Sequence, residues 1–337
     1  MVNLLALILA TILFFPSAGL TNFENPTNPL VGSQSTFRIL TLNVMQRADT
    51  PRAQRFANIV DYLDTQPPVH ALALQEFSGG SVDSPAGTED SGADLAGMLG
   101  GKYGYYTESS HRYDYFFGLG IFWLEFKVGV LSRYAMDYHA ATKLDPAGLN
   151  YSDGEEFSGR ANVVMCIIDI PGFGSVNLFS THFYNGPVSE LQTQANKLME
   201  FVNQEDQAHP SRATIVSGDM NFVLSTATQG IYDTFLSNGF TDSYREANTD
   251  PGYTFGVSED PYANTDSPRR IDYIFVRGDD LEISSSQVVF DGINGDYVSD
   301  HFGVLTEITA TPLPSSLLLL GSSLLGLAGL GYRRRRK

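Results

Sequence analysis

The chain has only one cysteine, Cys166, among its 337 residues. An intramolecular disulfide is therefore impossible in whatever compartment the protein works. Cys166 lies in the apolar run NVVMCIIDI, which predicts a buried strand. In such a run a cysteine is interpreted as a small hydrophobic residue rather than as a reactive thiol.

Basic residues are also scarce, with 21 Lys and Arg against 38 Asp and Glu and a net charge of −17. Five of the basic residues close the chain, at positions 333–337, so the rest holds 16 basic against 38 acidic residues and carries −22. A protein region this acidic repels polyanions unless metal ions or local basic clusters reduce the repulsion. The composition argues against a nucleic-acid-binding module and leaves open an enzyme that uses cations.

The first residues, MVNLLALILATILFFPSAG, contain no Lys or Arg but hold an apolar stretch followed by small residues. The stretch is about twelve residues long, which suits the hydrophobic region of a signal peptide and is short for a membrane span. We therefore predict a signal peptide over residues 1–19 and export of the protein.

The far end of the chain holds an apolar run from Leu313 to Gly331, closed by the basic block. Its length suits a spanning helix, and the basic block favours a cytoplasmic C-terminus. The layout of residues 311–337 resembles a PEP-CTERM sorting signal, with Thr-Pro-Leu-Pro at 311–314 in place of the usual Val-Pro-Glu-Pro. The resemblance implies transient membrane anchoring and an exosortase-type processing enzyme as partner. A permanent tail anchor is the alternative.

Between these ends, short apolar runs rich in Val, Ile, Leu and Phe recur, as expected of strands buried in a layered protein. Several of them stop at a polar residue. The runs FRILTLNV, HALALQEF, SVNLFSTHF and ATIVSGDMN end at Asn43, at Glu76, at His182, and at Asp219 with Asn221.

Apolar residues recur every three or four positions in three other segments, which predicts amphipathic helices. Ser189 is a candidate N-cap for the second, and Gly239 is expected to end the third. The runs 161–170 and 175–183 leave no room for a helix between them, so we expect them to pair antiparallel. Strands interleaved with helices indicate an α/β fold. The helical segments are 51–66 (Ala53, Phe56, Ile59, Val60 and Leu63), 189–204 (Leu191, Ala195, Leu198 and Val202) and 227–240.

Two further segments stand out by composition. Residues 78–92 are rich in Gly, Ser and Asp and predict a surface loop. Residues 113–126 are dense in aromatic side chains and include the only tryptophan, Trp123. A core hairpin and an exposed apolar finger that docks on lipid are both compatible with this pattern.

The polar residues at the strand ends make up a set suited to phosphoester cleavage. Carboxylates and amides hold a hard divalent cation, and imidazoles move protons. Four other histidines, His70, His111, His139 and His209, match no motif and are interpreted as structural. The set consists of Asn43, Glu76, His182, Asp219, Asn221, Asp272, Asp300 and His301.

Seven stretches in this order resemble the endonuclease/exonuclease/phosphatase superfamily, which includes deoxyribonuclease I and the neutral sphingomyelinases. They span roughly residues 36–309, the predicted catalytic domain. The resemblance implies a four-layer α/β sandwich of two mixed sheets packed face to face and flanked by helices, with the site at one edge. The stretches are LTLNVMQ, LALQEF, VGVLSRY, FSTHF, SGDMN, RRIDYIFV and VSDHFGV.

The resemblance also implies roles for the polar residues. Glu76 would be the principal ligand of Mg²⁺ or Mn²⁺, with Asn43 beside it and Asp300 toward the metal. Asp219 and Asn221 would contact the phosphate and the attacking water or a second metal.

The two histidines would handle protons in this scheme. His301 would act as the general base or bind phosphate, with Asp272 fixing its tautomer. His182 would protonate the leaving oxygen or stabilise the charged phosphate. Arg160 stands where family members often place a phosphate-contacting cation, although an ordinary arginine at a strand start is an equal alternative.

The substrate stays open at this stage. The stretch STHF favours the deoxyribonuclease I, sphingomyelinase and phosphoinositide-phosphatase branches over those resembling exonuclease III. The acidic body favours a phospholipid or small diester over a long polyanion. We expect a monomeric, exported, metal-dependent phosphodiesterase; an extracellular nuclease and a catalytically silent surface protein are the alternatives.

Overall fold

The computed structural model describes residues 23–45, 52–80, 89–117, 120–144, 161–262 and 267–311. The predicted signal peptide and the hydrophobic segment 313–331 lie outside these ranges. Within the described part of the chain, no helix has the length and apolar character needed to cross a membrane.

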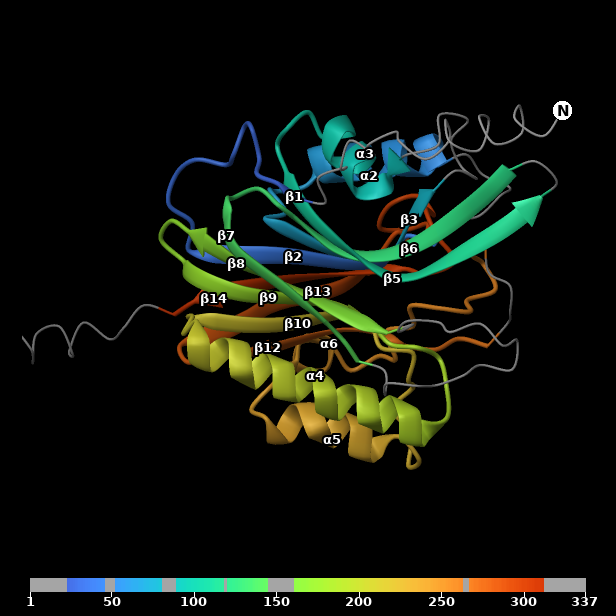
Figure 1. Cartoon of the computed structure of the whole chain (residues 1–337). Coiled ribbons are helices and arrows are strands. Elements are labelled where there is room, and N and C mark those ends of the chain that lie inside the picture. Colours follow the sequence, from blue (N-terminus) through green and yellow to red (C-terminus); the bar gives the residue numbers. More distant parts are fainter. Residues whose placement is uncertain are drawn as a thin grey trace, which may run out of the picture.

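Two mixed β-sheets pack face to face, and helices cover their outer faces (Figure 1). This arrangement confirms the predicted four-layer sandwich. The first sheet has the order β1 (Phe23–Glu24), β5 (Gly104–Phe117), β6 (Gly120–Ser132), β3 (Ala71–Gly80), β2 (Thr36–Asn43), β14 (Gly303–Ala310) and β13 (Leu281–Val289), and β4 (Glu89–Asp90) pairs with β3. The second has the order β11 (Thr241–Asp242), β12 (Asp272–Arg277), β10 (Ala213–Asp219), β9 (Gly174–His182), β8 (Asn162–Ile170) and β7 (Met136–Lys143).

The helices divide between the two outer faces (Figure 1). Helices α2 (Arg52–Thr65) and α3 (Ser91–Met98) lie against the first sheet, and α4 (Val188–Ala208) and α5 (Gln229–Ser237) lie against the second. A short helix, α6 (Ser243–Ala247), follows β11. The side chains between the sheets are almost completely buried. Ile39, Cys166 and Ile215 belong to one apolar cluster there, and none of these three has any exposed surface. The buried Cys166 confirms its reading as a small core residue.

Helix positions follow the apolar spacing more closely than helix ends do. The three predicted helices form, and the runs 161–170 and 175–183 pair antiparallel as β8 and β9. Ala53, however, is exposed, and the buried face of α2 is completed instead by Arg55 and Tyr62. The Ser189 cap is also wrong, because α4 begins at Val188 with Pro187 in the N-cap position, two residues earlier than predicted, and has no side-chain cap.

The segment predicted as a loop over residues 78–92 is partly regular. Strand β3 extends through Gly80, and α3 begins at Ser91. Residues 81–88 lie outside the description. The aromatic segment forms paired backbone of β5 and β6, with Tyr113 opposite Leu124. The side chains of 109–125, Trp123 among them, lie outside the described part, so both readings of this segment remain predictions.

The strand directions bring the predicted polar residues to one edge of the sandwich. Strands β2 and β3 run parallel in the first sheet, and β9 and β10 run parallel in the second. Asn43, His182 and Asp219 are the last residues of β2, β9 and β10, and Glu76 lies in the second half of β3, before its end at Gly80. The start of β12 joins the same edge, because Asp272 pairs with Asp219 in an antiparallel register.

Candidate active site

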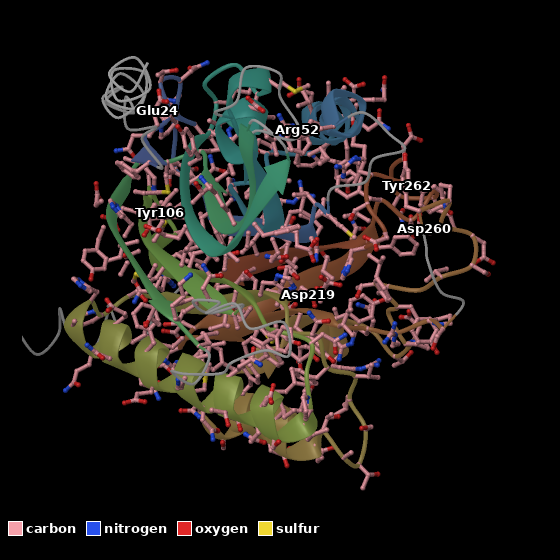
Figure 2. All side chains as sticks on the ribbon, turned by 45° about the vertical axis from the view of Figure 1, so that its right-hand side comes forward. Glu24, Arg52, Tyr106, Asp219, Asp260 and Tyr262 are labelled. Carbon is pink, nitrogen blue, oxygen red and sulfur yellow. The ribbon has the colours of Figure 1, made fainter. Side chains whose placement is uncertain are left out.

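Three polar side chains of the second sheet lie in one row across neighbouring strands. Asp219, the last residue of β10, is in register with His182 on one side and with Asp272 on the other. Asp219 and Asp272 are buried, with 1% and no exposure. Figure 2 shows Asp219 near the middle of the view, beside the strands. The row therefore places two carboxylates and an imidazole side by side in a setting with little water.

Glu76 reaches the site from a distorted position in β3. The pairing of β3 with β6 shifts between Leu74 and Phe77, and Glu76 has a φ of 56°. A left-handed non-glycine residue in a bulge costs free energy, and such residues cluster at functional sites, where a bulge redirects a side chain. The prediction that the run ends at Glu76 is wrong in detail, because the strand continues beyond this bulge to Gly80.

Asn43 connects the two sheets. Its Nδ2 donates to Glu76 Oε1 at 3.0 Å and to Asp219 Oδ2 at 3.1 Å. Its Oδ1 accepts from the backbone N–H of Met45 at 2.9 Å, which fixes the orientation of the amide. The nitrogen therefore faces the two carboxylates, and the amide would have to turn over for Asn43 to ligate a cation through oxygen as predicted.

His301 and Asp272 form a buried pair. His301 Nδ1 lies 3.0 Å from Asp272 Oδ2, while the other oxygen of Asp272 is buried without a hydrogen-bond partner. Burial alone lowers the pKa of His301, but the carboxylates of Asp272, Asp219 and Asp300 outweigh it and raise the pKa to about 10. His301 Nε2 points toward the row, 3.8 Å from Asp219 Oδ2.

His182 faces the same carboxylates from β9. Its Nε2 lies 3.5 Å from Asp219 Oδ2, 3.7 Å from Glu76 Oε1 and 3.2 Å from Asn221 Nδ2. Asn221 Nδ2 also donates to the carbonyl of Phe183 at 2.8 Å, so this atom is the amide nitrogen. A hydrogen bond from this amide to His182 Nε2 requires the imidazole tautomer whose proton is on Nδ1.

A tight turn holds Asn221 beside Asp219. The backbone N–H of Asn221 donates to Asp219 Oδ1 at 2.9 Å, and Asn221 has a φ of 50°. Asn tolerates this left-handed conformation better than most residues. Burial raises the pKa of Asp219, and Asp272 adds to the rise, while His301, His182 and the Asn221 N–H oppose it.

The donor set fits a hard divalent cation. The ligand atoms of Glu76, His182 and Asp219 lie within 4.8 Å of one another. Two carboxylate oxygens that converge in a low-dielectric setting repel each other, and a cation between them relieves that repulsion. A second group of Asp219, Asp272 and His301 meets the same spacing. Asp272 is already bonded to His301 there, so this group fits a proton-handling pair better than a metal site.

The predicted residues line a cavity of about 340 Å³. Phe255 and Arg269 also line it and were not predicted from the sequence, although Arg269 opens the quoted stretch RRIDYIFV. Arg160 lies outside the described residues, and its role remains a prediction. The predicted residues that line the cavity are Glu76, His182, Asp219, Asn221, Asp300 and His301.

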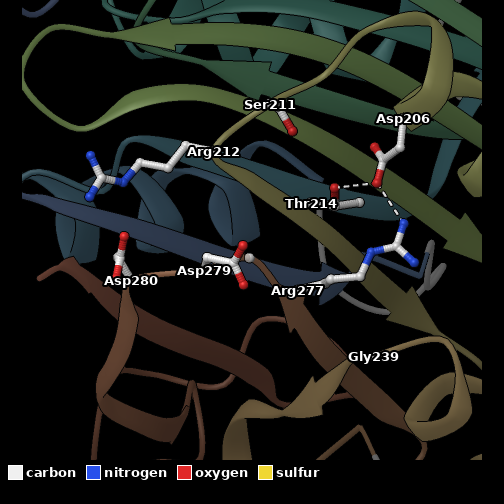
Figure 3. A pocket seen from close by; sticks show the side chains of 9 residues that line it. Asp206, Ser211, Arg212, Thr214, Gly239, Arg277, Asp279 and Asp280 are labelled. Carbon is white, nitrogen blue, oxygen red and sulfur yellow. Dashed lines mark hydrogen bonds and ion pairs between the residues drawn. The ribbon is translucent and has the colours of Figure 1, made fainter.

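A larger cavity of about 650 Å³ lies at the other end of β10 (Figure 3). There Arg277 pairs with Asp206 at 2.5 Å, and Asp206 also accepts from Thr214. Its lining contains no histidine. Two arginines and three aspartates line this cavity, but the imidazoles that the predicted chemistry requires are absent from its lining, so it does not match that chemistry.

Comparisons with known proteins agree with the geometry. The sequence profile of the Endonuclease/Exonuclease/phosphatase family matches residues 40–301. A comparison with curated protein sequences finds no match. A family protein from Leptotrichia buccalis is similar in structure, with a TM-score of 0.61 and 21% identity over 81% of this chain and 99% of that one.

Two other solved structures show how widely the fold is used. A mannosyl-6-phosphatase from Bacteroides thetaiotaomicron is 17% identical, with a TM-score of 0.58 over 81% of this chain and 99% of that one. D. rerio TDP2 in complex with a single-strand DNA product is 16% identical, with a TM-score of 0.58 over 82% of this chain and 100% of that one. At these identities the likeness concerns the fold alone.

Proposed function

Because the chain belongs to the endonuclease/exonuclease/phosphatase family, whose members are metal-dependent phosphoester hydrolases, we propose that it hydrolyses a phosphoester with water at the cavity described above. One observation carries the proposal. The amide of Asn43 joins the carboxylates of Glu76 and Asp219 from opposite sheets, and the His301–Asp272 pair lies against them. A cation site and a positioned base thus meet in one place.

From the group that meets the cation spacing we assign Glu76 and Asp219 to cation binding, and we add Asp300, which is outside that group but lines the same cavity. When bound, Mg²⁺ or Mn²⁺ would supply positive charge that polarises the phosphoryl group. Carboxylate oxygens suit either ion. Asn43 donates to both Glu76 and Asp219 and so orients their oxygens.

His301 is assigned the role of general base. Asp272 accepts the Nδ1–H of His301 and leaves Nε2 directed at the cavity, where a water would give up its proton. The raised pKa of His301 opposes this step, because a protonated imidazole cannot accept. A cation bound by Asp219 would neutralise the charge of this carboxylate. That charge is one of the contributions that raise the pKa of His301, so its loss would favour the neutral imidazole.

His182 and Asn221 are assigned to the phosphate. Both reach the cavity from the strand ends beside Asp219. In the tautomer that accepts from Asn221, His182 Nε2 has to take up a proton before it can donate to a leaving oxygen. A positioned acid of this kind typically contributes about 10²–10⁴-fold in rate.

For the substrate we propose a phospholipid or another small phosphodiester. The net charge of −17 supports this choice, because binding to a long polyanion normally recruits many Lys and Arg side chains. A nuclease remains the second candidate, since the similar structures include one that holds a DNA product. A silent surface protein is the third, and the assembled polar set argues against it.

We also propose that the protein is exported as a monomer and anchored at least transiently. The support is in the sequence, from the apolar stretch in 1–19 and the PEP-CTERM-like layout of 311–337. Fractionation of cells that produce the intact chain tests this. Protein found only in the cytoplasm, with its C-terminal segment uncut, would overturn export and exosortase-type processing.

The activity is tested with the purified full-length chain and Mg²⁺, Mn²⁺ or EDTA. Sphingomyelin, plasmid DNA and a chromogenic diester are the substrates. His301→Ala is expected to abolish turnover, whereas His209→Ala, a histidine at the end of α4, is its matched control. Hydrolysis that persists both in EDTA and in the His301→Ala variant would contradict the proposed mechanism. Cleavage of plasmid DNA but not of sphingomyelin would favour the nuclease.

A further inference from the structure

One cation in the cavity has no part in the chemistry assigned so far. Arg269 lines it together with Glu76, Asp219 and His301. Among the residues described as lining this cavity, it is the only Lys or Arg, whereas three carboxylates face the same space. A phosphate anion that enters therefore meets mostly negative side chains, and Arg269 is the side chain of fixed positive charge near it.

The position of Arg269 is fixed by stacking and by the backbone. Its guanidinium carbon lies 4.8 Å from the ring centre of Phe255, and that ring centre lies 4.7 Å from the ring centre of His301. The backbones of Phe255 and Arg269 exchange two hydrogen bonds of 3.0 and 2.8 Å. An aromatic face attracts a guanidinium without using its N–H groups, so their hydrogens remain available at the edge of the plane.

The donors of Arg269 are unused within the described part of the chain. Its Nε is buried without a hydrogen-bond partner, and no ion pair is formed by its guanidinium. The neighbouring Arg270 behaves differently, since its two terminal nitrogens bind Asp242 at 2.9 and 2.7 Å. The Nε atoms of four other arginines are also buried without a hydrogen-bond partner, so what distinguishes Arg269 is that it lines the cavity.

We propose that Arg269 is the phosphate-binding cation of this site. Its planar fork donates two N–H groups to the non-bridging oxygens of the substrate phosphate, while Phe255 holds it beside His301. This assignment rests on the proposed phosphoester hydrolysis. It gives Arg269 the part that the sequence suggested for Arg160, and it favours substrates whose phosphate keeps two unesterified oxygens within reach of the fork.

The test combines kinetics with direct binding of inorganic phosphate. Full-length wild type, Arg269→Ala and Arg269→Lys are compared in the hydrolysis of a chromogenic phosphodiester with Mn²⁺, and in calorimetric titration with phosphate. Arg245→Ala is the matched control, because it removes the same charge from an exposed arginine outside the cavity. Thermal unfolding of every variant checks that it is folded.

We expect Arg269→Ala to lower kcat/KM by about 10- to 100-fold and to weaken phosphate binding by a similar factor, as for loss of a charge-assisted hydrogen bond. Arg269→Lys keeps the positive charge but loses the planar fork of N–H groups. Its kcat/KM and its affinity for phosphate should therefore lie between those of wild type and Arg269→Ala. Arg245→Ala should change neither by more than about twofold.

The outcomes separate this assignment from the proposed function. A wild type that shows no hydrolysis but binds phosphate in a manner that depends on Arg269 supports the assignment and refutes the function. Hydrolysis and phosphate binding that both persist within about twofold in a folded Arg269→Ala variant overturn the assignment and leave the function standing. A wild type that does not bind phosphate overturns the assignment as well.

Discussion

His301 Nδ1 lies 3.0 Å from Asp272 Oδ2, although the two residues are 29 positions apart in the chain. The acid next to His301 in sequence, Asp300, lines the cavity instead. Two neighbours in the dipeptide Asp-His are thus assigned to different tasks at one phosphate. The register of β10 and β12 produces this division, because it places Asp272 against Asp219 at the edge where the loop before β14 returns.

Asp272→Asn should remove activity while leaving the fold intact. The asparagine keeps the shape of the buried side chain but offers an N–H to His301 Nδ1, which moves the imidazole proton to Nε2 and blocks proton uptake there. We expect kcat to fall by about 10²–10⁴-fold. Steady-state kinetics with the chromogenic diester measure this, with Asp233→Asn on the exposed face of α5 as control. A kcat within threefold of wild type would rule out the orienting role of Asp272.

Glu76→Gln should abolish stabilisation by divalent cations. A cation that binds only the folded state at about 100 times its Kd adds about 2.7 kcal/mol to the free energy of unfolding. Wild type should therefore melt at higher temperature with Mn²⁺ than with EDTA, and the glutamine variant should not. Glu282→Gln, on an exposed position of β13, should keep the wild-type response. An undiminished response in Glu76→Gln would remove Glu76 from the cation site.

The sequence predicts those features that depend on periodic burial. Phe56, Ile59 and Leu63 recur with helical spacing and define α2, and the apolar run before Asn43 defines β2. Helix α3 was not predicted, because it has only eight residues, too few to display a helical period, and its first two residues belong to the Gly/Ser/Asp-rich stretch 78–92. The bulge at Glu76 was not predicted either, because a single left-handed residue leaves the alternation of apolar and polar side chains along the strand almost unchanged.

The candidate site divides in a similar way. Asp219 and His182 could be anticipated because they end apolar runs, and the ends of parallel strands meet at one edge. Arg269 could not be distinguished from Arg270, since both precede the same strand. Only the tertiary structure shows that one binds Asp242 while the other faces the cavity. Pairing in space decides the role of a charged residue, and a single sequence does not record it.

Arg55 should be required for the position of two site loops. It is 2% exposed on α2, and its Nη1 donates to the carbonyls of Val44, at 3.2 Å, and Val298, at 2.9 Å. These residues adjoin Asn43 and the Asp300–His301 loop. Arg55→Met leaves buried carbonyls without these donors, so we expect a loss of about 1–3 kcal/mol in the free energy of unfolding.

The effect of Arg55 on activity separates positioning from simple stability. Arg55→Lys retains a buried donor and should fold, but one ammonium cannot reproduce the geometry of the guanidinium, so kcat should fall about tenfold with KM little changed. Arg52→Met on the same helix removes a partly exposed ion pair with Asp94 and should cost at most about 1 kcal/mol. Unaltered kcat in a folded Arg55→Lys variant would mean that Arg55 acts on stability alone.

His70 should make the protein less stable as the pH falls below 6.5. Its Nδ1 accepts the backbone N–H of Arg38 at 2.9 Å, and burial, followed by the charges of Arg38 and Arg133, lowers its pKa to about 4. Between pH 6.5 and 4 the unfolded chain takes up a proton at His70 that the folded protein does not, so the free energy of unfolding declines over this window and is unaffected by His70 above it. The difference between an ordinary pKa of 6.5 and one of about 4 corresponds to about 3 kcal/mol.

Denaturant unfolding at pH 7.5, 6, 5 and 4 measures this contribution by comparison with His70→Asn. The asparagine oxygen can accept the same N–H but does not titrate, so the variant should lose less stability on acidification than wild type by up to about 3 kcal/mol. His209→Asn, at the partly exposed end of α4, serves as control and should follow the wild-type curve. Parallel curves for wild type and His70→Asn would show that His70 is protonated in the folded protein as readily as in the unfolded chain.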